Sequence, residues 1–190
     1  MARLKLGVIV GSNRRESINR RLAQALTRLG NSAFDADFIQ IDDLPMYNQD
    51  FEQPVPQAVA RFKAAVENSD ALLFVTPEHS RSIPAVLKNA IDWGARPWGK
   101  TSWPGRPAAV IGTSGGAIST ALAQQHLRAV LSMQGLHLMG GEAYIQFKAD
   151  LVDTQGVIAD ENVRTFLKAF IDQFAAFAAR LAPARAQRAA

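Results

Sequence analysis

The 190-residue sequence contains no cysteine, and this absence removes several classes of chemistry. It excludes disulfides, thiol nucleophiles, and zinc or iron–sulfur sites that depend on cysteine ligands. The remaining soft ligands are three histidines, and their positions, His79, His126 and His137, do not have the spacing of a metal site. We therefore expect no metal centre.

Long apolar runs are also missing. No stretch reaches the length of about 18 apolar residues that a membrane helix requires. The short apolar run that follows Arg3 and Lys5 does not match a secretory leader, so we expect a cytoplasmic protein. The net charge is +4, and the basic residues are concentrated around residues 14–21 and in the tail, at Arg185 and Arg188. No aromatic side chains interleave with these arginines. This pattern favours a solvated basic face with one anion-binding residue over a nucleic-acid surface.

Three familiar motifs are absent as well. The sequence has no GxGxxG dinucleotide fingerprint, no GxxxxGK[ST] phosphate loop, and no GxSxG elbow of a serine hydrolase. What the sequence does have is a regular alternation of apolar strand patterns with amphipathic helix patterns. The expected strands are 4–10, 36–41, 71–76, 107–113 and 136–145, and the expected helices are 17–29, 56–68, 84–93, 117–134 and 161–181.

This alternation predicts an α/β protein with a five-stranded parallel sheet and helices on both faces, in three layers. We expect a single domain over residues 1–182 and a frayed basic tail over 183–190. In such sheets the ligand lies beyond the carboxyl ends of the strands. The loops "GSNRRESIN", "TPEHSRS" and "TSGGA" follow the first, third and fourth strands, and we expect them to converge there.

The first of these loops has the composition of an anion site. It leads into a helix N-terminus, where free N–H groups favour negative charge, and Ser12, Ser17 and Asn19 add neutral donors. Arg14 adds a charged donor. Nothing resembles a pyrophosphate track, so we expect one phosphate. The alternative is that Ser17 only caps the helix, and both roles are compatible.

Other candidate residues have a structural as well as a functional interpretation. Glu78, His79 and Arg81 are individually typical of a solvated loop, but they follow a buried strand, which favours function. His126 lies on an apolar stripe with Ile118, Leu122 and Ala129, which predicts a packed core or interface position. His137 opens a strand without an acidic partner nearby.

The segment from residue 90 to 105 contains all three tryptophans. They either fill the core or, with the neighbouring arginine, form an interface. The helix over 117–134 has a second apolar edge, Leu127 and Leu131, besides the stripe that we expect to face the sheet. Together these features predict a homo-oligomer.

The motifs "GSNRRESIN", "PEHSRSIPAVLKNAIDW" and "GTSGGA" together resemble those of the NAD(P)H-dependent FMN reductase family, especially its chromate, quinone and ferric reductase branch. The resemblance covers about residues 4–145. It implies a flavodoxin-like fold with bound FMN, NADH or NADPH as co-substrate, and dimers that often pair into tetramers. Because FMN performs the chemistry, no catalytic side chain is implied.

The resemblance also assigns the site residues by position. The implied phosphate contacts are Ser12, Arg14, Ser17, Ile18 and Asn19; the segment along the isoalloxazine is Pro77, Glu78, His79, Ser80 and Arg81; and the third wall is Ser114 and Gly115. Family members commonly have tyrosine and asparagine where this chain has His79 and Ser80. Arg96 has the spacing of an arginine that lies near a subunit interface and the site mouth, so it and His79 are the implied substrate contacts.

The implied reaction is a ping-pong cycle in which the nicotinamide passes a hydride to the flavin and leaves, and an acceptor then takes the electrons. Quinones, chromate, ferric complexes and free flavin are the implied acceptors. Two other functions remain open on the sequence: a flavodoxin-type electron carrier, and a phosphate-binding regulatory domain without flavin. Carriers are usually acidic, whereas this chain is basic.

Overall fold

The computed structural model describes residues 3–149, 151–153 and 156–188. Strands and helices alternate along the chain, as expected. In chain order the elements are β1 (Leu4–Val10), α1 (Ile18–Leu29), β2 (Phe34–Phe38), η1 (Gln49–Phe51), α2 (Gln57–Asn68), β3 (Ala71–Val75), α3 (Ala85–Gly94), β4 (Pro107–Ser114), α4 (Ala121–Met133), β5 (His137–Leu138), β6 (Tyr144–Gln146) and α5 (Glu161–Arg188).

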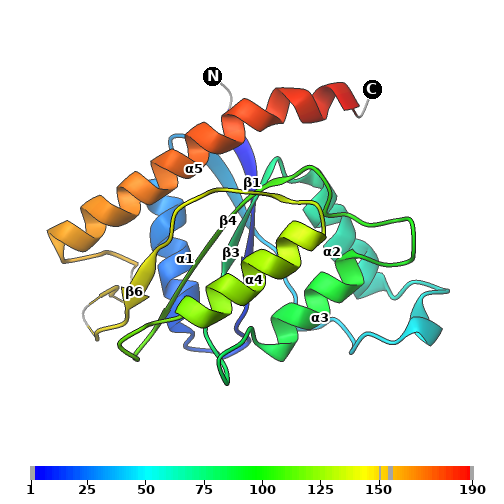
Figure 1. Ribbon diagram of the computed structural model, residues 1–190, viewed down its shortest axis with the longest axis horizontal. Coiled ribbons are helices and arrows are strands. Elements are labelled where there is room, and N and C mark those ends of the chain that lie inside the picture. Colours follow the sequence, from blue (N-terminus) through cyan, green and yellow to red (C-terminus); the bar gives the residue numbers. More distant parts are fainter. Residues whose placement is uncertain (1–2, 150, 154–155, 189–190) are drawn as a thin grey trace.

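The strands form one parallel sheet in the order β2-β1-β3-β4-β5, and β6 also pairs with β4. Strand order reverses at β1, so the chain builds one half of the sheet outward to β2 and then the other half from β3 onward. The strands run downward in Figure 1, and their carboxyl ends meet at the lower edge of the sheet. This is the flavodoxin-like α/β architecture, and the expected fold class is confirmed.

The core has two parts, one on each face of the sheet. One cluster packs α1 and α5 against the sheet, and the other packs α2, α3 and α4 against the opposite face. All five residues of β3 are buried, which explains its continuous apolar sequence. The helices therefore fix the strand ends, from which the site loops emerge, in one rigid frame.

The expected fifth strand is interrupted. Instead of one strand over 136–145, the chain pairs His137–Leu138 with the start of β4 and Tyr144–Gln146 with its end. Gly140 and Gly141 lie between the two pieces, and Gly141 has a φ of 89°. A left-handed backbone conformation cannot continue a strand, so the glycine pair divides the strand.

The last helix is longer than expected. It continues through Pro183 to Arg188 rather than ending near residue 181. Alanine is the best helix former, and alanines at 182, 184 and 186 favour continuation although the proline removes one backbone donor. Residues 189–190 of the expected tail lie outside the described residues.

Helix α4 faces the sheet with the opposite edge from the one expected. Leu127 and Leu131 are fully buried in the core, whereas Ile118 and Leu122 are 48% and 41% exposed. His126 is exposed too, so of the two positions expected for it the core is wrong, and an interface position stays a prediction. The helix is apolar on two stripes, and hydrophobic spacing alone does not say which stripe meets the sheet.

The tryptophans divide between the two expected roles. Trp93 and Trp103 are buried, and their indole N–H groups donate to the carbonyl oxygens of Pro45 at 2.7 Å and Ile91 at 3.0 Å. Trp98 is 87% exposed. Two tryptophans therefore fill the core, and only Trp98 is available for contact with another molecule.

Candidate functional site

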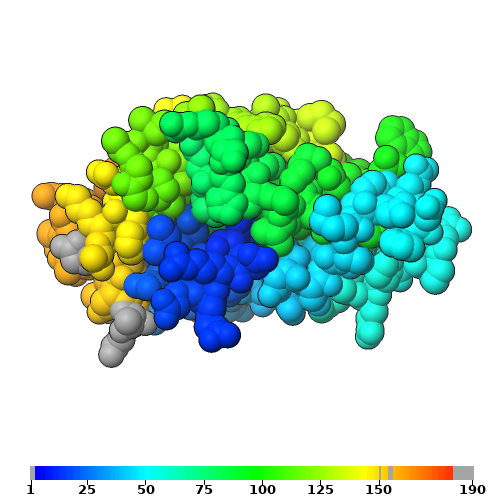
Figure 2. All heavy atoms as spheres, turned by 90° about the horizontal axis from the view of Figure 1, so that it is seen from below, coloured from blue at the N-terminus to red at the C-terminus, as the bar shows by residue number. Residues whose placement is uncertain are grey.

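The three loops identified from the sequence converge on one pocket of about 320 Å³ at the carboxyl edge of the sheet. This volume lies within the usual range of ligand pockets, about 300–1,000 Å³. Figure 2 looks at this edge from below: the blue loop after β1 lies directly beside the green segment that contains the loop after β3. The lining residues are Gly11, Ser12, Asn13, Arg14, Ser17, Ile18, Asn19, Pro77, Glu78, His79, Pro84, Val86, Thr113, Ser114 and Gly115.

The loop after β1 ends at a well-formed helix cap. The Ser17 hydroxyl accepts a hydrogen bond from the Arg20 N–H at 3.2 Å, so Ser17 does cap α1. The backbone N–H groups of Ile18 and Asn19, in the first turn, are among those that a helix leaves without internal partners. Since both residues line the pocket, the positive end of the α1 dipole lies at its wall.

Asn19 is engaged in holding the frame. Its side chain is 1% exposed and makes two hydrogen bonds to one residue: its amide donates to the Thr113 carbonyl at 2.9 Å and its oxygen accepts from the Thr113 N–H at 3.0 Å. These bonds tie the first turn of α1 to the end of β4. The side chain is thus not a spare donor, and an anion in the pocket would meet the backbone N–H of Asn19 instead.

Other side chains of the same loop are not used in this way. In the part of the chain that the structure describes, no hydrogen bond or ion pair involves the side chains of Ser12, Asn13, Arg14 or Arg15. Ser12 is half-buried and the other three are exposed. Arg14 lines the pocket and Arg15 does not, which makes Arg14 the better candidate for a charged contact.

The loop after β3 is a tight hairpin. His79 and Ser82 exchange two backbone hydrogen bonds of 3.0 and 2.9 Å. The two residues between them have positive φ angles, 49° at Ser80 and 64° at Arg81, as in a type I′ turn. Pro77, Glu78 and His79 line the pocket, whereas Ser80 and Arg81 form the hairpin tip outside its lining.

Glu78 fastens this hairpin to α4. Its carboxylate is only 8% exposed; one oxygen accepts from the Ala123 N–H at 3.0 Å, and the other lies 3.3 Å from the Arg81 guanidinium. A carboxylate at the N-terminus of a helix is stabilised by the helix dipole. Glu78 is therefore a capping group for α4 and is not arranged as a free base.

The loop after β4 is braced by its own hydroxyl groups. Thr113 and Ser119 each donate to the Ile145 carbonyl at 2.6 Å, and Ser114 donates to the Ser119 carbonyl at 2.9 Å.

A Cβ on Gly112 would lie 2.0 Å from the Thr76 carbonyl oxygen, so only glycine allows this approach of β4 to β3.

Gly115 is different from Gly112. A Cβ built on it meets nothing within 4 Å, and its φ is not in the left-handed range. The protein alone does not require glycine at this position, yet the residue lines the pocket. Bare backbone here lets a flat ligand approach the loop closely. The pocket therefore offers donors for an anion at the α1 end and uncovered backbone at Gly115.

Arg96 belongs to a different cavity. Its guanidinium lies 5.6 Å from the centre of the Tyr47 ring and 3.7 Å from the Glu52 carboxylate, beside a cavity of about 630 Å³. The Tyr47 hydroxyl donates to Glu52 at 2.8 Å, and this hydrogen bond, with desolvation, raises the pKa of the phenol. Within one chain, Arg96 does not reach the pocket that the three loops form.

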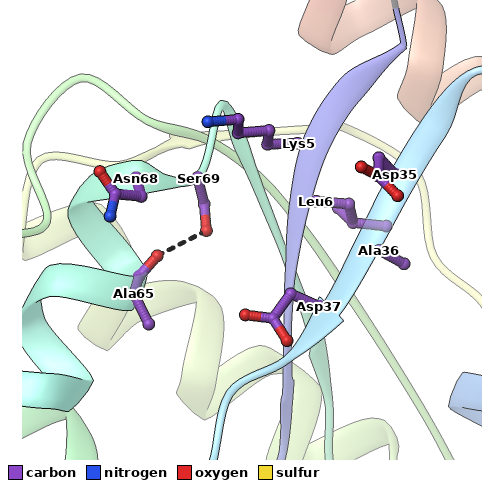
Figure 3. A pocket seen from close by; sticks show the side chains of 8 residues that line it. All are labelled: Lys5, Leu6, Asp35, Ala36, Asp37, Ala65, Asn68 and Ser69. Atoms are coloured by element: carbon purple, nitrogen blue, oxygen red, sulfur yellow. Dashed lines mark hydrogen bonds between the residues drawn. The ribbon is translucent and has the colours of Figure 1, made fainter.

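A further hollow, of about 480 Å³, lies at the other end of the strands. Figure 3 shows it between the end of α2 and strands β1 and β2, with Lys5, Asp35 and Asp37 around it. Its Ser69 hydroxyl is already bonded to the Ala65 carbonyl at 2.8 Å. Size alone therefore does not identify the site; the convergence of loops at the carboxyl edge does.

The described residues form neither a metal-binding cluster nor a membrane-spanning helix. No group of histidine, aspartate or glutamate side chains among them is arranged to hold a metal ion. No helix in the described part of the chain combines the length and the apolar character needed to cross a membrane.

A doubly wound sheet with a loop pocket beyond the carboxyl ends of its strands, and a helix N-terminus at the pocket wall, is the arrangement of the flavodoxin-like class of flavin proteins. The sequence profile of one family in that class, described as NADPH-dependent FMN reductase, matches residues 4–150. The chain belongs to this family. The expected cofactors, FMN and a nicotinamide nucleotide, are confirmed at the level of the family, and so is the expectation of a redox enzyme rather than an electron carrier.

Individual relatives agree with this assignment. The chain is 47% identical to a 2-hydroxy-1,4-benzoquinone reductase from a Burkholderia species, over 92% of this chain and 96% of that one. It is 45% identical to a quinone reductase from Pseudomonas putida, over 90% and 93%. Among solved structures, the chain is similar to FerB, a flavoenzyme NAD(P)H:(acceptor) oxidoreductase from Paracoccus denitrificans. The two structures superpose with a TM-score of 0.91 and are 42% identical in sequence, over 94% of this chain and 98% of that one.

Proposed function

We propose that this protein takes a hydride from NADH or NADPH onto FMN and passes the electrons to a quinone in a ping-pong cycle. The observation behind the proposal is the convergence of three loops on one pocket in a chain of the FMN reductase family. The names of the Burkholderia and Pseudomonas relatives support quinones as acceptors. Chromate, ferric complexes and free flavin are further acceptors that we include in the proposal.

In this proposal the loop after β1 binds the phosphate of FMN. Arg14 supplies the charge, Ser12 a hydroxyl donor, and Ile18 and Asn19 their backbone N–H groups, while Ser17 keeps the helix end in place. One phosphate is enough for these donors, which favours FMN over a dinucleotide.

The other two loops hold the ring. Pro77, Glu78 and His79 border one side and Ser114 and Gly115 the other, with Ser80 and Arg81 at the rim. FMN supplies hydride acceptance and electron release when it is bound. The braced loops keep their backbone N–H groups in fixed positions, where they stabilise negative charge that develops on the ring.

We further propose that His79 acts as a lid rather than as an acid. It is exposed at the pocket edge, so it can cover or uncover an acceptor. Reduced quinones take protons readily from water, and an essential side-chain acid is therefore not needed. In this scheme Arg96 acts at the mouth of a site only across a subunit contact, because it is in another cavity of its own chain.

We propose a homodimer, with pairing of dimers, that works in the cytoplasm. Large apolar side chains remain exposed on and near α4: Trp98 is 87% exposed, Met133 74%, Ile118 48% and Leu122 41%. Such surfaces are typical of interfaces. These residues replace the Leu127–Leu131 edge that the sequence suggested. Sedimentation at micromolar concentration tests the assembly, and a clean monomer contradicts it.

An absorption spectrum and mass analysis of the released flavin test the central proposal. We expect bound FMN, steady oxidation of NADH or NADPH when benzoquinone is added, and parallel double-reciprocal plots. Bound FAD contradicts the single-phosphate argument. A protein that stays colourless after addition of FMN contradicts the proposed function as a whole, and supports a phosphate-binding domain without flavin.

A further inference from the structure

The hairpin beside the pocket is attached to α4 at two points. Glu78, before the hairpin, accepts from the Ala123 N–H at 3.0 Å, and Ser82, after it, has its hydroxyl 2.7 Å from Nδ1 of His126. Ala123 and His126 are one turn apart on α4, so both arms of the hairpin rest on the same stretch of helix. His126 is exposed, and its ring has this one hydrogen bond among the described residues.

Ser82 connects this contact to the pocket. Its backbone N–H and carbonyl both bond to His79, the hairpin residue that lines the pocket. A displacement of Ser82 therefore moves His79 through two backbone hydrogen bonds. The hairpin tip between them is short, only Ser80 and Arg81, so the position of one arm determines the position of the other.

We infer that His126 and Ser82 are positioning residues for the flavin-facing hairpin: the side-chain hydrogen bond between them fixes His79 at the edge of the pocket. The inference rests on the proposed function for the identity of the ligand. It adds a residue of α4, outside the three loops and outside the pocket lining, to the residues that set the shape of the site. Serine both donates and accepts, so the contact forms with either tautomer of the imidazole.

The test is a double-mutant cycle with Ser82→Ala, His126→Ala and the double variant. The first measurement is hydrogen exchange at the amides of His79 and Ser82 in the protein without added flavin. We expect each single variant to speed this exchange by about two- to tenfold, the effect of losing one hydrogen bond, and the double variant to be no faster than either. The second measurement is FMN affinity, which we expect to fall by a similar factor.

Two further variants distinguish positioning from a general loss of structure. His126→Asn places an amide oxygen near the position of Nδ1, and we expect it to restore slow exchange and tight FMN binding. His137→Ala removes another exposed histidine, in β5, and serves as the control. We expect this control to leave both measurements unchanged. Visible circular dichroism of bound FMN should differ from the wild type in Ser82→Ala, His126→Ala and the double variant, and in neither His126→Asn nor the control.

The inference is wrong if the single alanine variants exchange at the wild-type rate, if their effects add fully in the double variant, or if His126→Asn behaves like His126→Ala. Failure of the proposed function looks different. A wild-type protein that binds no flavin contradicts the proposed function, whereas the exchange measurement still decides whether His126 and Ser82 hold the hairpin.

Discussion

The first part of the loop after β1, before the helix cap at Ser17, differs from the loops after β3 and β4 in whether its polar side chains have partners. Within the described residues, Ser12, Arg14 and Arg15 make no side-chain hydrogen bonds or ion pairs. In the other two loops nearly every hydroxyl and carboxylate has an internal partner, as Glu78 has in Ala123 and Ser119 has in Ile145. The unpaired side chains of the first loop are thus available to a ligand, whereas those of the other two loops are already used in holding the protein together.

Because of this difference, we expect the two ends of the ligand to be recognised by different interactions. A phosphate dianion is recognised by charge, and flexible donors such as Arg14 can adjust to it. A planar ring is recognised by shape and by fixed backbone donors, which stabilise charge without further reorganisation. Substitutions of the unpaired side chains in the first loop should thus change ligand affinity. Substitutions of the residues that brace the other two loops should change the stability of the protein first.

The largest effect is expected for Gly112→Ala. The added methyl would lie 2.0 Å from the Thr76 carbonyl oxygen and 2.6 Å from the Thr120 hydroxyl, so the backbone of β3 or β4 must shift. We expect a loss of about 3 kcal/mol in the free energy of unfolding, at the upper end of the cost of overpacking. Urea denaturation measures it, and a wild-type midpoint would contradict the close contact.

Gly115→Ala is the matched control in the same segment. Its methyl has open space, so the free energy of unfolding should change by less than about 0.5 kcal/mol. FMN affinity should fall, because the methyl then occupies the wall against which the ring is proposed to lie. Equal stability losses in both glycine variants would remove the distinction between the frame and the ligand wall.

The next effect concerns the first loop. Arg14→Ala should weaken FMN binding by about 1.5–3 kcal/mol, the range for hydrogen bonds to charged groups, or roughly ten- to a hundredfold in Kd. Arg15→Ala should do much less, because Arg15 is exposed and does not line the pocket. Fluorescence titration of FMN measures both values, and equal losses would show that the wrong arginine was chosen.

Much of the fold could be predicted because hydrophobic patterning is a local property. The wholly apolar β3 and the capped helix α1 follow directly from their sequences. The sheet-facing edge of α4 could not be predicted, since the helix is apolar on two stripes and only packing selects Leu127 over Leu122. The interruption of the last strand had a visible signal, the pair Gly140 and Gly141.

Which residues lie at the site was easier to predict than what each of them does there. Topology alone brings the three loops together at the carboxyl edge. The partners of Asn19 and Glu78 are 94 and 45 residues away along the chain, so no local pattern reveals that these side chains brace the frame. Gly112 did carry a signal, because an isolated glycine in a buried strand indicates a close backbone approach.

A smaller effect is expected at His79, which belongs to the braced hairpin but faces the pocket. His79→Tyr should keep hydride transfer from the nicotinamide within about tenfold, about 1.4 kcal/mol in the barrier, and should mainly shift the KM for the quinone. Stopped-flow bleaching of the flavin isolates the first half-reaction, and reoxidation by quinone the second. If reoxidation at saturating quinone falls by about 10²-fold or more, His79 is an acid and not a lid.

The smallest effect is expected at the hairpin tip, and it tests whether the frame is strained where it meets solvent. Ser80 has a φ of 49°, and asparagine tolerates this left-handed conformation better than serine does. Ser80→Asn should therefore raise the free energy of unfolding by about 0.5–1 kcal/mol, or Tm by about 1–4 °C, and leave FMN affinity unchanged because Ser80 is outside the pocket lining. Ser80→Ala keeps the strain and should give no gain. Calorimetry of the three proteins compares them directly, and an asparagine variant no more stable than the alanine variant would mean that the hairpin stores no strain at this residue.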